Sequence, residues 1–287
     1  MTEHVTLAII GGSGLYEMPG LQDPREYNIN TPFGKTSAPI VVGTLEGGQV
    51  GFLARHGIGH HITPSEVPYR ANIYALKSLG VERIISISAC GSLQEQFAPG
   101  HIVIPDQVYD NTHKRARSFF EEGLVAHVSV ADPFCRDLSD QLESAVRLAG
   151  AIAHRGGSLI TIEGPRFSTQ AESKTYRSWG MSIIGMTASP EIFLAREAEI
   201  CYATMAHVTD YDVWHGSEAP VTVEMVIQTL NKNTLLAQEA VKILARDLKR
   251  ERDCECEDAL AAALITHKDI IPPGTLTKLE LLVNKYL

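Results

Sequence analysis

Two carboxylates that stand two residues apart, Asp210 and Asp212, follow an apolar run that begins at Cys201. In an extended chain, side chains at i and i+2 point the same way, so both could face one edge of a ligand. A purine that departs as a leaving group is favoured by protonation at N7, and a 6-amino group on it needs an acceptor. One protonated and one ionised Asp would satisfy both needs. Raising an Asp pKa from about 3.9 to about 7 costs some 4 kcal/mol, within the reach of burial. Two solvent-exposed residues capping the next segment are the alternative.

A second group of residues could bind an anion. Arg55 and His56 follow an apolar run, and an arginine at a strand end can hold phosphate through charge-assisted hydrogen bonds worth roughly 1.5–3 kcal/mol each. The turn GGSG at 11–14 follows another apolar run, so its backbone N–H groups can approach an anion and Ser13 adds a hydroxyl. A turn without a ligand and a structural role for His56 are the alternatives.

This glycine-rich turn departs from two well-known motifs. Glu17 stands where a dinucleotide fingerprint needs its third glycine, and Leu15 stands where a hydrolase nucleophile elbow needs its last one. His60 and His61 lie near His56, but this loop lacks the carboxylate or thiolate that a zinc site would add. We therefore expect no metal in the reactive site.

Two other segments could line a ligand. The small residues of SISACGS, at 86–92, leave room at a strand end, where open α/β sheets bind ligands, although a simple bend would look similar. In the loop TIEGPRFS, Phe167 could stack on a flat heterocycle and Ser168 could reach a sugar or base. Glu163 or Arg166 could order this loop. An ordinary loop is the alternative.

The five cysteines do not form a secreted-type disulfide framework, and their odd number leaves at least one free thiol. Cys90, Cys135 and Cys201 lie in apolar surroundings and are expected to be small core residues. Cys254 and Cys256 form a Cys-x-Cys pair. This pair could be half of a zinc site, but no second pair follows at zinc spacing, so the sequence does not predict a metal. A disulfide involving the pair is the other alternative.

The composition limits the partners of the chain. A net charge of -9 argues against a nucleic-acid surface, which needs a basic stripe to replace counterions. No apolar run reaches the roughly 18 residues of a membrane helix, and MTEHVTLAIIGG lacks the basic start of a signal peptide. We therefore expect a cytoplasmic protein that binds neither nucleic acid nor membranes.

Apolar β-branched runs alternate with helical patterns along most of the chain, as is typical of an α/β fold. The predicted strands span 6–10, 40–45, 50–54, 83–88, 101–105, 158–162, 182–186 and 201–208. The predicted helices span 66–79 with Ser65 as N-cap, 136–148, 171–179, 190–198 and 222–249, and a shorter helical pair ends the chain. Several strands lack polar alternation, so both of their faces should be covered. Residues 110–122 are expected to form a loop over a site or an interface.

Six ordered motifs, taken together, resemble the methylthioadenosine phosphorylase branch of the purine nucleoside phosphorylase family. They are IIGGSGL, TPFGKTSAPI, LARHGIGHHITPSEVPYRANIYAL, SACGSLQEQFAPGHIVIPDQ, TIEGPRFSTQAES and MTASPE with ATMAHVTDYDVW, and the likeness spans about residues 8 to 245. The resemblance implies one α/β domain over 1–287, with a helical tail from about 250. Its twisted mixed sheet would form in part a distorted barrel surrounded by helices. Three subunits would form a ring, as a trimer or a dimer of trimers.

The resemblance also implies the roles of individual residues. Ser13, Arg55, His56, Ser88 and Thr187 would bind phosphate. Met186 would lie under the ribose, Phe167 and Ser168 would touch the base, and Asp210 and Asp212 would bind N7 and the 6-amino group, with Asp210 as the catalytic acid. Val223, Val226 and Ile227 would line the methylthio pocket, to which a neighbouring subunit adds His127. Ordinary core packing is the alternative for the three helical residues.

The activity implied by this resemblance is the phosphorolysis of 5'-methylthioadenosine to adenine and 5-methylthioribose 1-phosphate, with phosphate as co-substrate and no cofactor. The alternative is a phosphorylase of 6-oxopurine nucleosides such as inosine, guanosine or methylthioinosine, in whose known members an Asn replaces the Asp that binds the base. One departure concerns this choice. His207 stands where the family usually has an apolar residue, close enough to the Asp pair to affect base preference.

Overall fold

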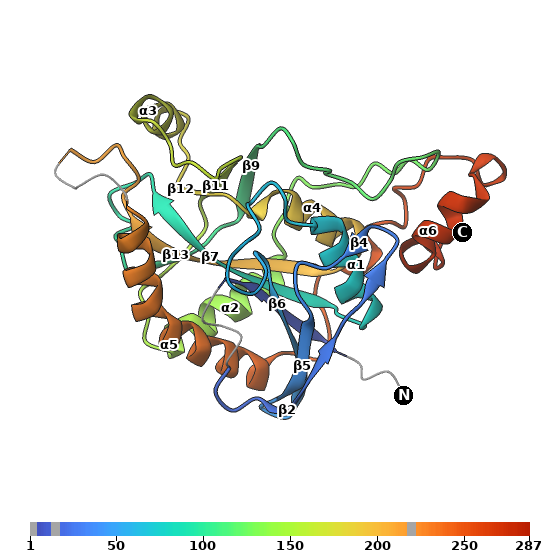
Figure 1. Cartoon of the computed structure of the whole chain (residues 1–287), viewed down its shortest axis with the longest axis horizontal. Helices are drawn as coiled ribbons and strands as arrows, with labels where there is room; N and C mark the ends of the chain where they lie inside the picture. Colours follow the sequence, from blue (N-terminus) through green and yellow to red (C-terminus); the bar gives the residue numbers. More distant parts are fainter. Residues whose placement is uncertain (1–4, 13–17, 217–221) are drawn as a thin grey trace.

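A computed structural model describes residues 5–12, 18–216 and 222–287. A parallel group of strands forms its centre (Figure 1). Strand β1 (Leu7–Gly11) lies between β6 (Gly48–Ala54) and β7 (Arg83–Ser92), and β13 (Cys201–Asp210) runs along the other side of β7. All four strands point the same way, so their carboxyl ends meet at one edge of the sheet. This edge carries the motifs that could do chemistry.

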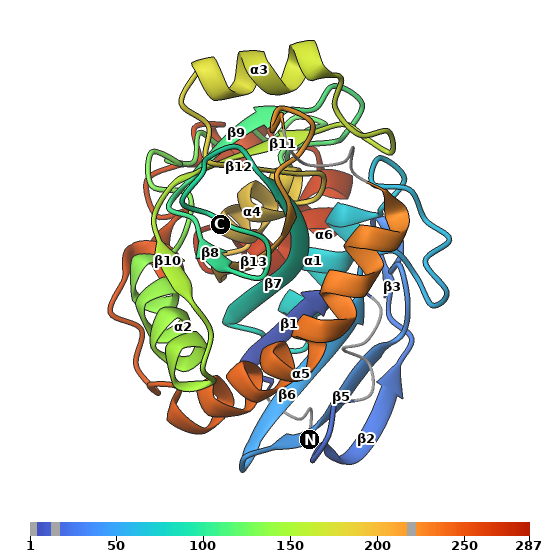
Figure 2. The same cartoon turned by 90° about the vertical axis from the view of Figure 1, so that its left-hand side faces the viewer.

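In the part of the chain that the structure describes, the other strands extend this centre into a mixed sheet of 11 strands. On one side β6 pairs with β5 (Ile40–Leu45) and then β2 (Gln22–Tyr27); on the other, β13 pairs with β8 (Ile102–Ile104) and then β10 (Ala153–Arg155). A second arm leaves β7 through β12 (Ile183–Gly185), β11 (Ser158–Ile162) and β9 (Gln107–Asn111). The short strands β3 (Asn30–Thr31) and β4 (Gly34–Lys35) pair separately. The mixed sheet implied by the resemblance is confirmed, and the two arms give it a curled, open form (Figure 2).

Helices cover both faces of the centre, because successive residues of its strands are apolar on both sides. Ala8 and Ile10 pack in a cluster with α1 (Tyr69–Ser78), α4 (Ala188–Glu197) and α6 (Pro273–Val283). Leu7 and Ile9 pack in a second cluster with α2 (Arg136–Leu148) and α5 (Val223–Asp247). Helix α3 (Gln170–Ser178) lies apart from these layers, near the second arm, and the short helices η1 (Glu255–Asp258) and η2 (Lys268–Ile270) lead to α6 (Figures 1 and 2). The expected coverage of both faces is confirmed.

Each predicted strand and long helix is present, with shifted ends. Strands β2, β3, β4, β9 and β10 were not predicted, since their residues are largely polar and exposed or the strands are very short. The helix predicted from 66 begins only at Tyr69, after Pro68. The prediction of Ser65 as its N-cap is wrong, because the Ser65 hydroxyl donates to Glu163 instead. Within the described residues, no helix is both long and apolar enough to span a membrane.

Candidate active site

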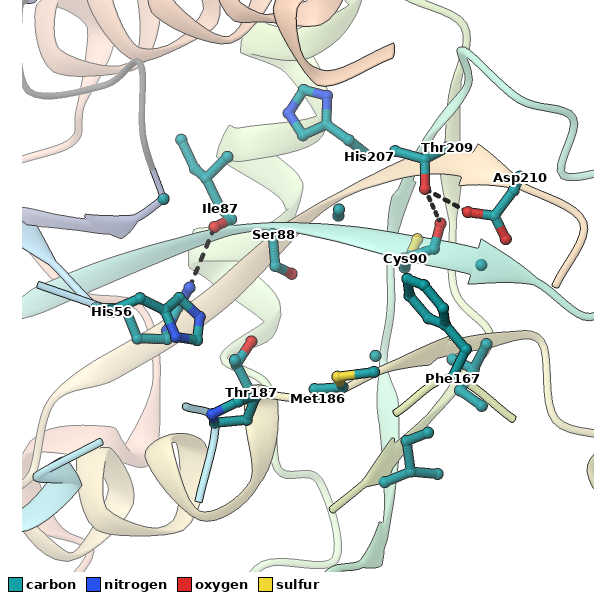
Figure 3. Close-up of a pocket in the computed structure, with 18 of the residues that line it drawn as sticks. His56, Ile87, Ser88, Cys90, Phe167, Met186, Thr187, His207, Thr209 and Asp210 are labelled. Carbon is teal, nitrogen blue, oxygen red and sulfur yellow. Dashed lines mark hydrogen bonds between the residues drawn. The ribbon is translucent and has the colours of Figure 1, made fainter. Parts of the chain in front are cut away.

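A cavity of about 270 Å³ opens where the central strands end. Its walls come from the carboxyl ends of β6, β7, β12 and β13, with Gly12 just after β1. Figure 3 shows His56, Ser88 and Thr187 at one end of the cavity, Phe167 and Asp210 at the other, and Met186 between them. Most of the predicted site residues therefore meet around a single space, although their segments lie far apart in the sequence.

Arg55, which follows β6, is a deeply buried charge of the site and is 1% exposed. Its Nε and Nη2 donate to the two carboxylate oxygens of Glu191 at 2.8 and 2.9 Å, and Nη2 also donates to the Ser86 hydroxyl at 2.7 Å. Burial alone would lower the pKa of Arg55, but the Glu191 carboxylate raises it above the usual value. A fixed cation thus stands at the strand ends, held in one orientation by its partner.

His56, next to Arg55, forms part of the same wall. Its Nδ1 lies 2.9 Å from the carbonyl oxygen of Ile62, which can only accept a hydrogen bond, so Nδ1 carries the proton and Nε2 is left as an acceptor in the neutral ring. Burial and the charge of Arg55 lower the pKa of His56 to about 4. At neutral pH this ring is uncharged and offers Nε2 to a ligand that can donate a proton, such as the hydroxyl of monoprotonated phosphate.

Two hydroxyls complete this end of the cavity. Ser88 projects from β7, and Thr187 precedes α4 at the end of β12 (Figure 3). Thr187 is the N-cap residue of α4, but its side chain makes no capping hydrogen bond, which leaves the hydroxyl available to a ligand. Hydroxyl donors, a guanidinium and an imidazole acceptor make an arrangement suited to a phosphate dianion or monoanion.

The opposite end is acidic. Asp210 is 7% exposed, its Oδ2 accepts from the Thr209 hydroxyl at 2.6 Å, and its Oδ1 accepts from the backbone N–H of Asp212 at 2.8 Å. Burial raises the pKa of Asp210 above its usual value, although the two hydrogen bonds act against this rise. A carboxyl group with a raised pKa can be protonated near neutral pH and donate to a leaving base.

Asp212 does not share the strand geometry expected of it. Strand β13 ends at Asp210, and Asp212 lies beyond it with a φ of 50°. Burial raises the pKa of Asp212 as well, although the nearby hydroxyls of Ser173 and Ser168 oppose this. Among the described residues, its Oδ2 has no hydrogen-bond partner despite being buried, so it is an acceptor without a donor. The two carboxyls still border one cavity, because the turn after β13 brings Asp212 back beside Asp210.

Gly91 leaves the space that these carboxyls border. A Cβ at this position of β7 would lie 3.0 Å from Oδ1 of Asp210 and from Cγ2 of Ile184, and 3.3 Å from Cβ of Asp212. These distances are shorter than ordinary van der Waals contacts, so a side chain here would push the acidic wall out of place. The small residues at 86–92 thus make room for a ligand, as the sequence suggested.

The loop that carries Phe167 and Ser168 is held by Glu163. Its carboxylate accepts from the backbone N–H groups of His113 and Lys114 at 2.6 and 3.1 Å and from Nε of Arg115 at 3.2 Å, and the Ser65 hydroxyl also donates to it. These donors lower the pKa of Glu163 to about 2, against the effect of burial. The prediction that Glu163 orders this loop is confirmed.

Phe167 and Ser168 both line the cavity, and the Phe167 ring is 39% exposed. An exposed aromatic ring at the edge of an acidic wall gives a flat heterocycle a surface on which to stack. Figure 3 shows the ring between Met186 and Asp210, which is the arrangement needed for a base bound next to a sugar.

The sequence and the fold were compared with known proteins. Residues 6–246 match the family model of the phosphorylase superfamily. An S-methyl-5'-thioadenosine phosphorylase of Geobacter sulfurreducens is 52% identical over 98% of this chain and 99% of its own length, and one of Koribacter versatilis is 51% identical over 98% and 96%. The chain belongs to the S-methyl-5'-thioadenosine phosphorylases of this superfamily.

Solved structures of methylthioadenosine phosphorylases share the fold. One from an Antarctic soil metagenomic library is 48% identical, with a TM-score of 0.91 over 98% of this chain and 99% of that one. Another, from Schistosoma mansoni in complex with adenine, is 36% identical, with a TM-score of 0.86 over 92% of this chain and 99% of that one. The family assignment therefore rests on sequence and fold alike.

Not every residue that the phosphorylase resemblance singled out borders this cavity. Ser13 lies outside the described residues, as does the side chain of Val226. Val223 and Ile227, at the start of α5, are 58% and 50% exposed. The interpretation of these two as ordinary core of one chain is therefore wrong. His127 is also exposed and lies away from the cavity of its own chain.

Three residues of this phosphorylase site had no predicted role. Glu191 fixes Arg55, and Thr209 donates to Asp210. Arg115 is buried, and its Nη1 donates to the carbonyl oxygens of Met186 and Ser189 at 2.7 and 2.6 Å, while Nη2 donates to that of Glu163 at 2.8 Å. The signal for Glu191 was a carboxylate inside the apolar run PEIFLA. For Arg115 the signal was the charged segment 110–122, in which Arg115 is buried while Lys114 and Arg117 are exposed.

Proposed function

We propose that this chain catalyses the reversible phosphorolysis of 5'-methylthioadenosine to adenine and 5-methylthio-D-ribose 1-phosphate, a pentosyl transfer in purine and methionine salvage. The observation that carries the proposal is the buried Asp210 carboxyl, which faces the Arg55–His56 end of one cavity across Met186. A phosphate and a purine bound at these two ends would hold a ribose between them.

Phosphate occupies the end formed by Arg55, His56, Ser88 and Thr187, with Ser13 added from the glycine-rich turn. The hydroxyls of Ser88 and Thr187 donate to phosphate oxygens, and Nε2 of neutral His56 accepts from the phosphate hydroxyl. Arg55 borders this end, with its charge paired to Glu191. Because Glu191 holds the guanidinium in place, it is already oriented before phosphate binds.

The purine occupies the acidic end. Phe167 stacks on the ring and Ser168 lies beside it. Asp210, whose pKa is raised by burial, donates a proton to N7, and Oδ2 of Asp212, which has no partner among the described residues, accepts from the 6-amino group. An amino group therefore satisfies a buried acceptor, which a 6-oxo group would leave unpaired, so the site favours adenine over hypoxanthine.

The reaction is a direct displacement without a covalent enzyme intermediate. The bond between C1' and N9 breaks, its electron pair goes to the purine, and the Asp210 proton goes to N7. A phosphate oxygen forms the new bond to C1'. Met186, an unbranched thioether, fits under the ribose while positive charge develops on the sugar. Phosphate is the co-substrate, and the displacement uses no cofactor.

The methylthio group needs an apolar cover, and Val223 and Ile227 are apolar side chains that are exposed in the single chain. We place it near the start of α5, with Val226 as the third apolar residue and His127 supplied by a neighbouring subunit. The functional unit is then a homo-oligomer, a trimer or a dimer of trimers. We assign it to the cytoplasm, where its two substrates are small soluble molecules.

One assay tests this function. The chain is incubated with 5'-methylthioadenosine, adenosine or inosine, with and without inorganic phosphate, and the free base is measured. We expect adenine from methylthioadenosine only when phosphate is present, and a preference over inosine that can reach about 10⁴. Base release without phosphate would indicate a hydrolase. Turnover of inosine equal to that of methylthioadenosine would indicate a 6-oxopurine phosphorylase. Binding of the nucleoside without any base release would indicate a nucleoside-binding protein.

A further inference from the structure

Four of the five cysteines meet at one point, far from the active site. The Sγ atoms of Cys135, Cys201, Cys254 and Cys256 all lie within 4.8 Å of one another, and those of Cys201 and Cys254 are 3.4 Å apart. We infer that these four thiolates bind one Zn²⁺ ion, which fastens the C-terminal segment to the body of the fold.

The four ligands come from three elements that are distant in sequence. Cys135 is the N-cap residue of α2, and Cys201 is the first residue of β13. Backbone bonds fix both: the Cys135 N–H donates to the carbonyl oxygen of Tyr202, and the Cys201 N–H donates to that of Glu82, each at 2.9 Å. Half of the site therefore belongs to the rigid core, and the Cys-x-Cys segment closes it.

The distances suit a tetrahedral metal. With a Zn–S bond of about 2.3 Å, the sulfurs of a four-thiolate zinc site are about 3.8 Å apart. The observed cluster fits that spacing within small side-chain movements. Two disulfides would join the sulfurs in pairs and would not require all four to meet, whereas a single tetrahedral ion does require it. A soft divalent ion such as Zn²⁺ is the one that four thiolates prefer.

Burial and charge also fit a bound ion. Cys135, Cys201 and Cys256 are 1–2% exposed, and Cys254 is partly buried, so the site is closed, as structural zinc sites are. Zn²⁺ with four thiolates carries two net negative charges. The guanidinium of Arg252, which also pairs with Glu257, lies against Cys201, and Arg196 is close to Cys256, so two cations stand beside this negative charge. Binding displaces four protons, one from each thiol, into solvent.

The segment that follows Cys256 packs against another part of the chain, so an ion that anchors this segment would have a structural role. After Cys256 the chain reaches 263–265, where it pairs with 125–127: the N–H of His127 donates to the carbonyl oxygen of Ala263 at 2.9 Å, and that of Ile265 donates to the carbonyl oxygen of Val125 at 3.1 Å. An anchored C-terminal segment thus holds His127 in place. The ion takes no part in catalysis, since the ten residues of β13 separate Cys201 from Asp210 by about 30 Å.

The test measures metal in the whole, untagged protein, isolated under argon with a phosphine reductant after growth with added zinc. We expect one zinc ion per chain when the metal content is measured by inductively coupled plasma mass spectrometry. The Cys254→Ser/Cys256→Ser variant should lose it, while Cys90→Ala, which removes the fifth cysteine, should keep it. Fully reduced protein without zinc overturns the inference, as does zinc that persists in the double variant or a pair of disulfides linking the four cysteines under these conditions.

A second measurement holds even if the double variant does not fold. Zinc is removed from the wild-type chain with a chelator and replaced by Co²⁺, whose visible spectrum reports the ligands. We expect the intense sulfur-to-cobalt charge-transfer bands and the strong d–d bands of a tetrahedral four-thiolate site, together with a melting temperature that rises again on metal addition. Weak spectra typical of oxygen and nitrogen ligands, or no binding of Co²⁺, overturn the inference. Neither readout depends on phosphorylase activity.

Discussion

Both carboxylate oxygens of Glu191 accept hydrogen bonds from Arg55, and each of these side chains is 1% exposed. The Tyr202 hydroxyl donates to Glu191 as well, at 2.8 Å. A charge pair removed from water this completely is stable only while both partners are present. Glu191 thus keeps an arginine charged in the interior of a protein whose net charge is -9.

We expect Glu191→Ala to lower the free energy of unfolding by about 3–5 kcal/mol, because it leaves the Arg55 charge buried without its counter-ion. Denaturation in urea measures this change. The matched control is Asp247→Ala, which removes the exposed partner of Arg246 and should leave the midpoint almost unchanged. Equal midpoints for the two variants would contradict the importance given to the buried pair.

Replacing Asp210 with Ala should lower kcat for methylthioadenosine by about two to four orders of magnitude, since the proton donor to the leaving base is lost. Steady-state kinetics at saturating phosphate measure it. Asp132→Ala, an exposed carboxylate outside the site, serves as the control. An unchanged kcat in Asp210→Ala would show that another group protonates the purine.

The Gly91→Ala variant tests whether the nucleoside and phosphate bind at different ends of the site. The added Cβ would lie 3.0 Å from Oδ1 of Asp210, and crowding of this kind costs about 1–3 kcal/mol. We expect KM for the nucleoside to rise roughly ten-fold or more, with little change in KM for phosphate. Gly48→Ala, where the nearest atom to the new Cβ is 3.8 Å away, is the control. Equal increases in both KM values would show that the base does not bind beside Gly91.

His207 makes the fold sensitive to acid. Burial lowers its pKa to about 4, and among the described residues neither ring nitrogen has a hydrogen-bond partner. Between pH 6.5 and pH 4 the unfolded chain therefore binds a proton at this residue that the folded chain does not, so stability falls as the pH falls through this range. The loss between pH 7 and pH 5 is about 2 kcal/mol.

We expect His207→Leu to reduce the loss of unfolding free energy between pH 7 and pH 5 by about 2 kcal/mol, while the loss that His56 contributes remains. His267→Gln, at an exposed position, should keep the wild-type pH dependence. If His207→Leu and the wild type lose the same stability on acidification, His207 is not buried as a neutral ring.

Several features of this protein could be predicted because they depend on local pattern. Continuous apolar runs predicted the central strands, since a strand covered on both faces has no polar side. The order of the six motifs predicted the family. Strand ends carrying Arg55, Ser88 and Asp210 predicted room for a ligand at one edge of the sheet, where the cavity lies, because parallel strands bring their carboxyl ends together. Weakly apolar strands such as β2 carry no such pattern, so they were missed.

Contacts between residues that are distant in sequence were decided by the tertiary structure alone. Arg55 and Glu191 are 136 positions apart, and their contact depends on how β6 and α4 pack. The Asp212 carboxylate reaches the cavity through a turn rather than along a strand, a difference of backbone angle that i, i+2 spacing does not reveal. In the sequence, Cys135 and Cys201 looked like core residues, and Cys254 and Cys256 looked like half of a zinc site. Only folding brings the four sulfurs together, because each lies on an element positioned by contacts elsewhere in the chain.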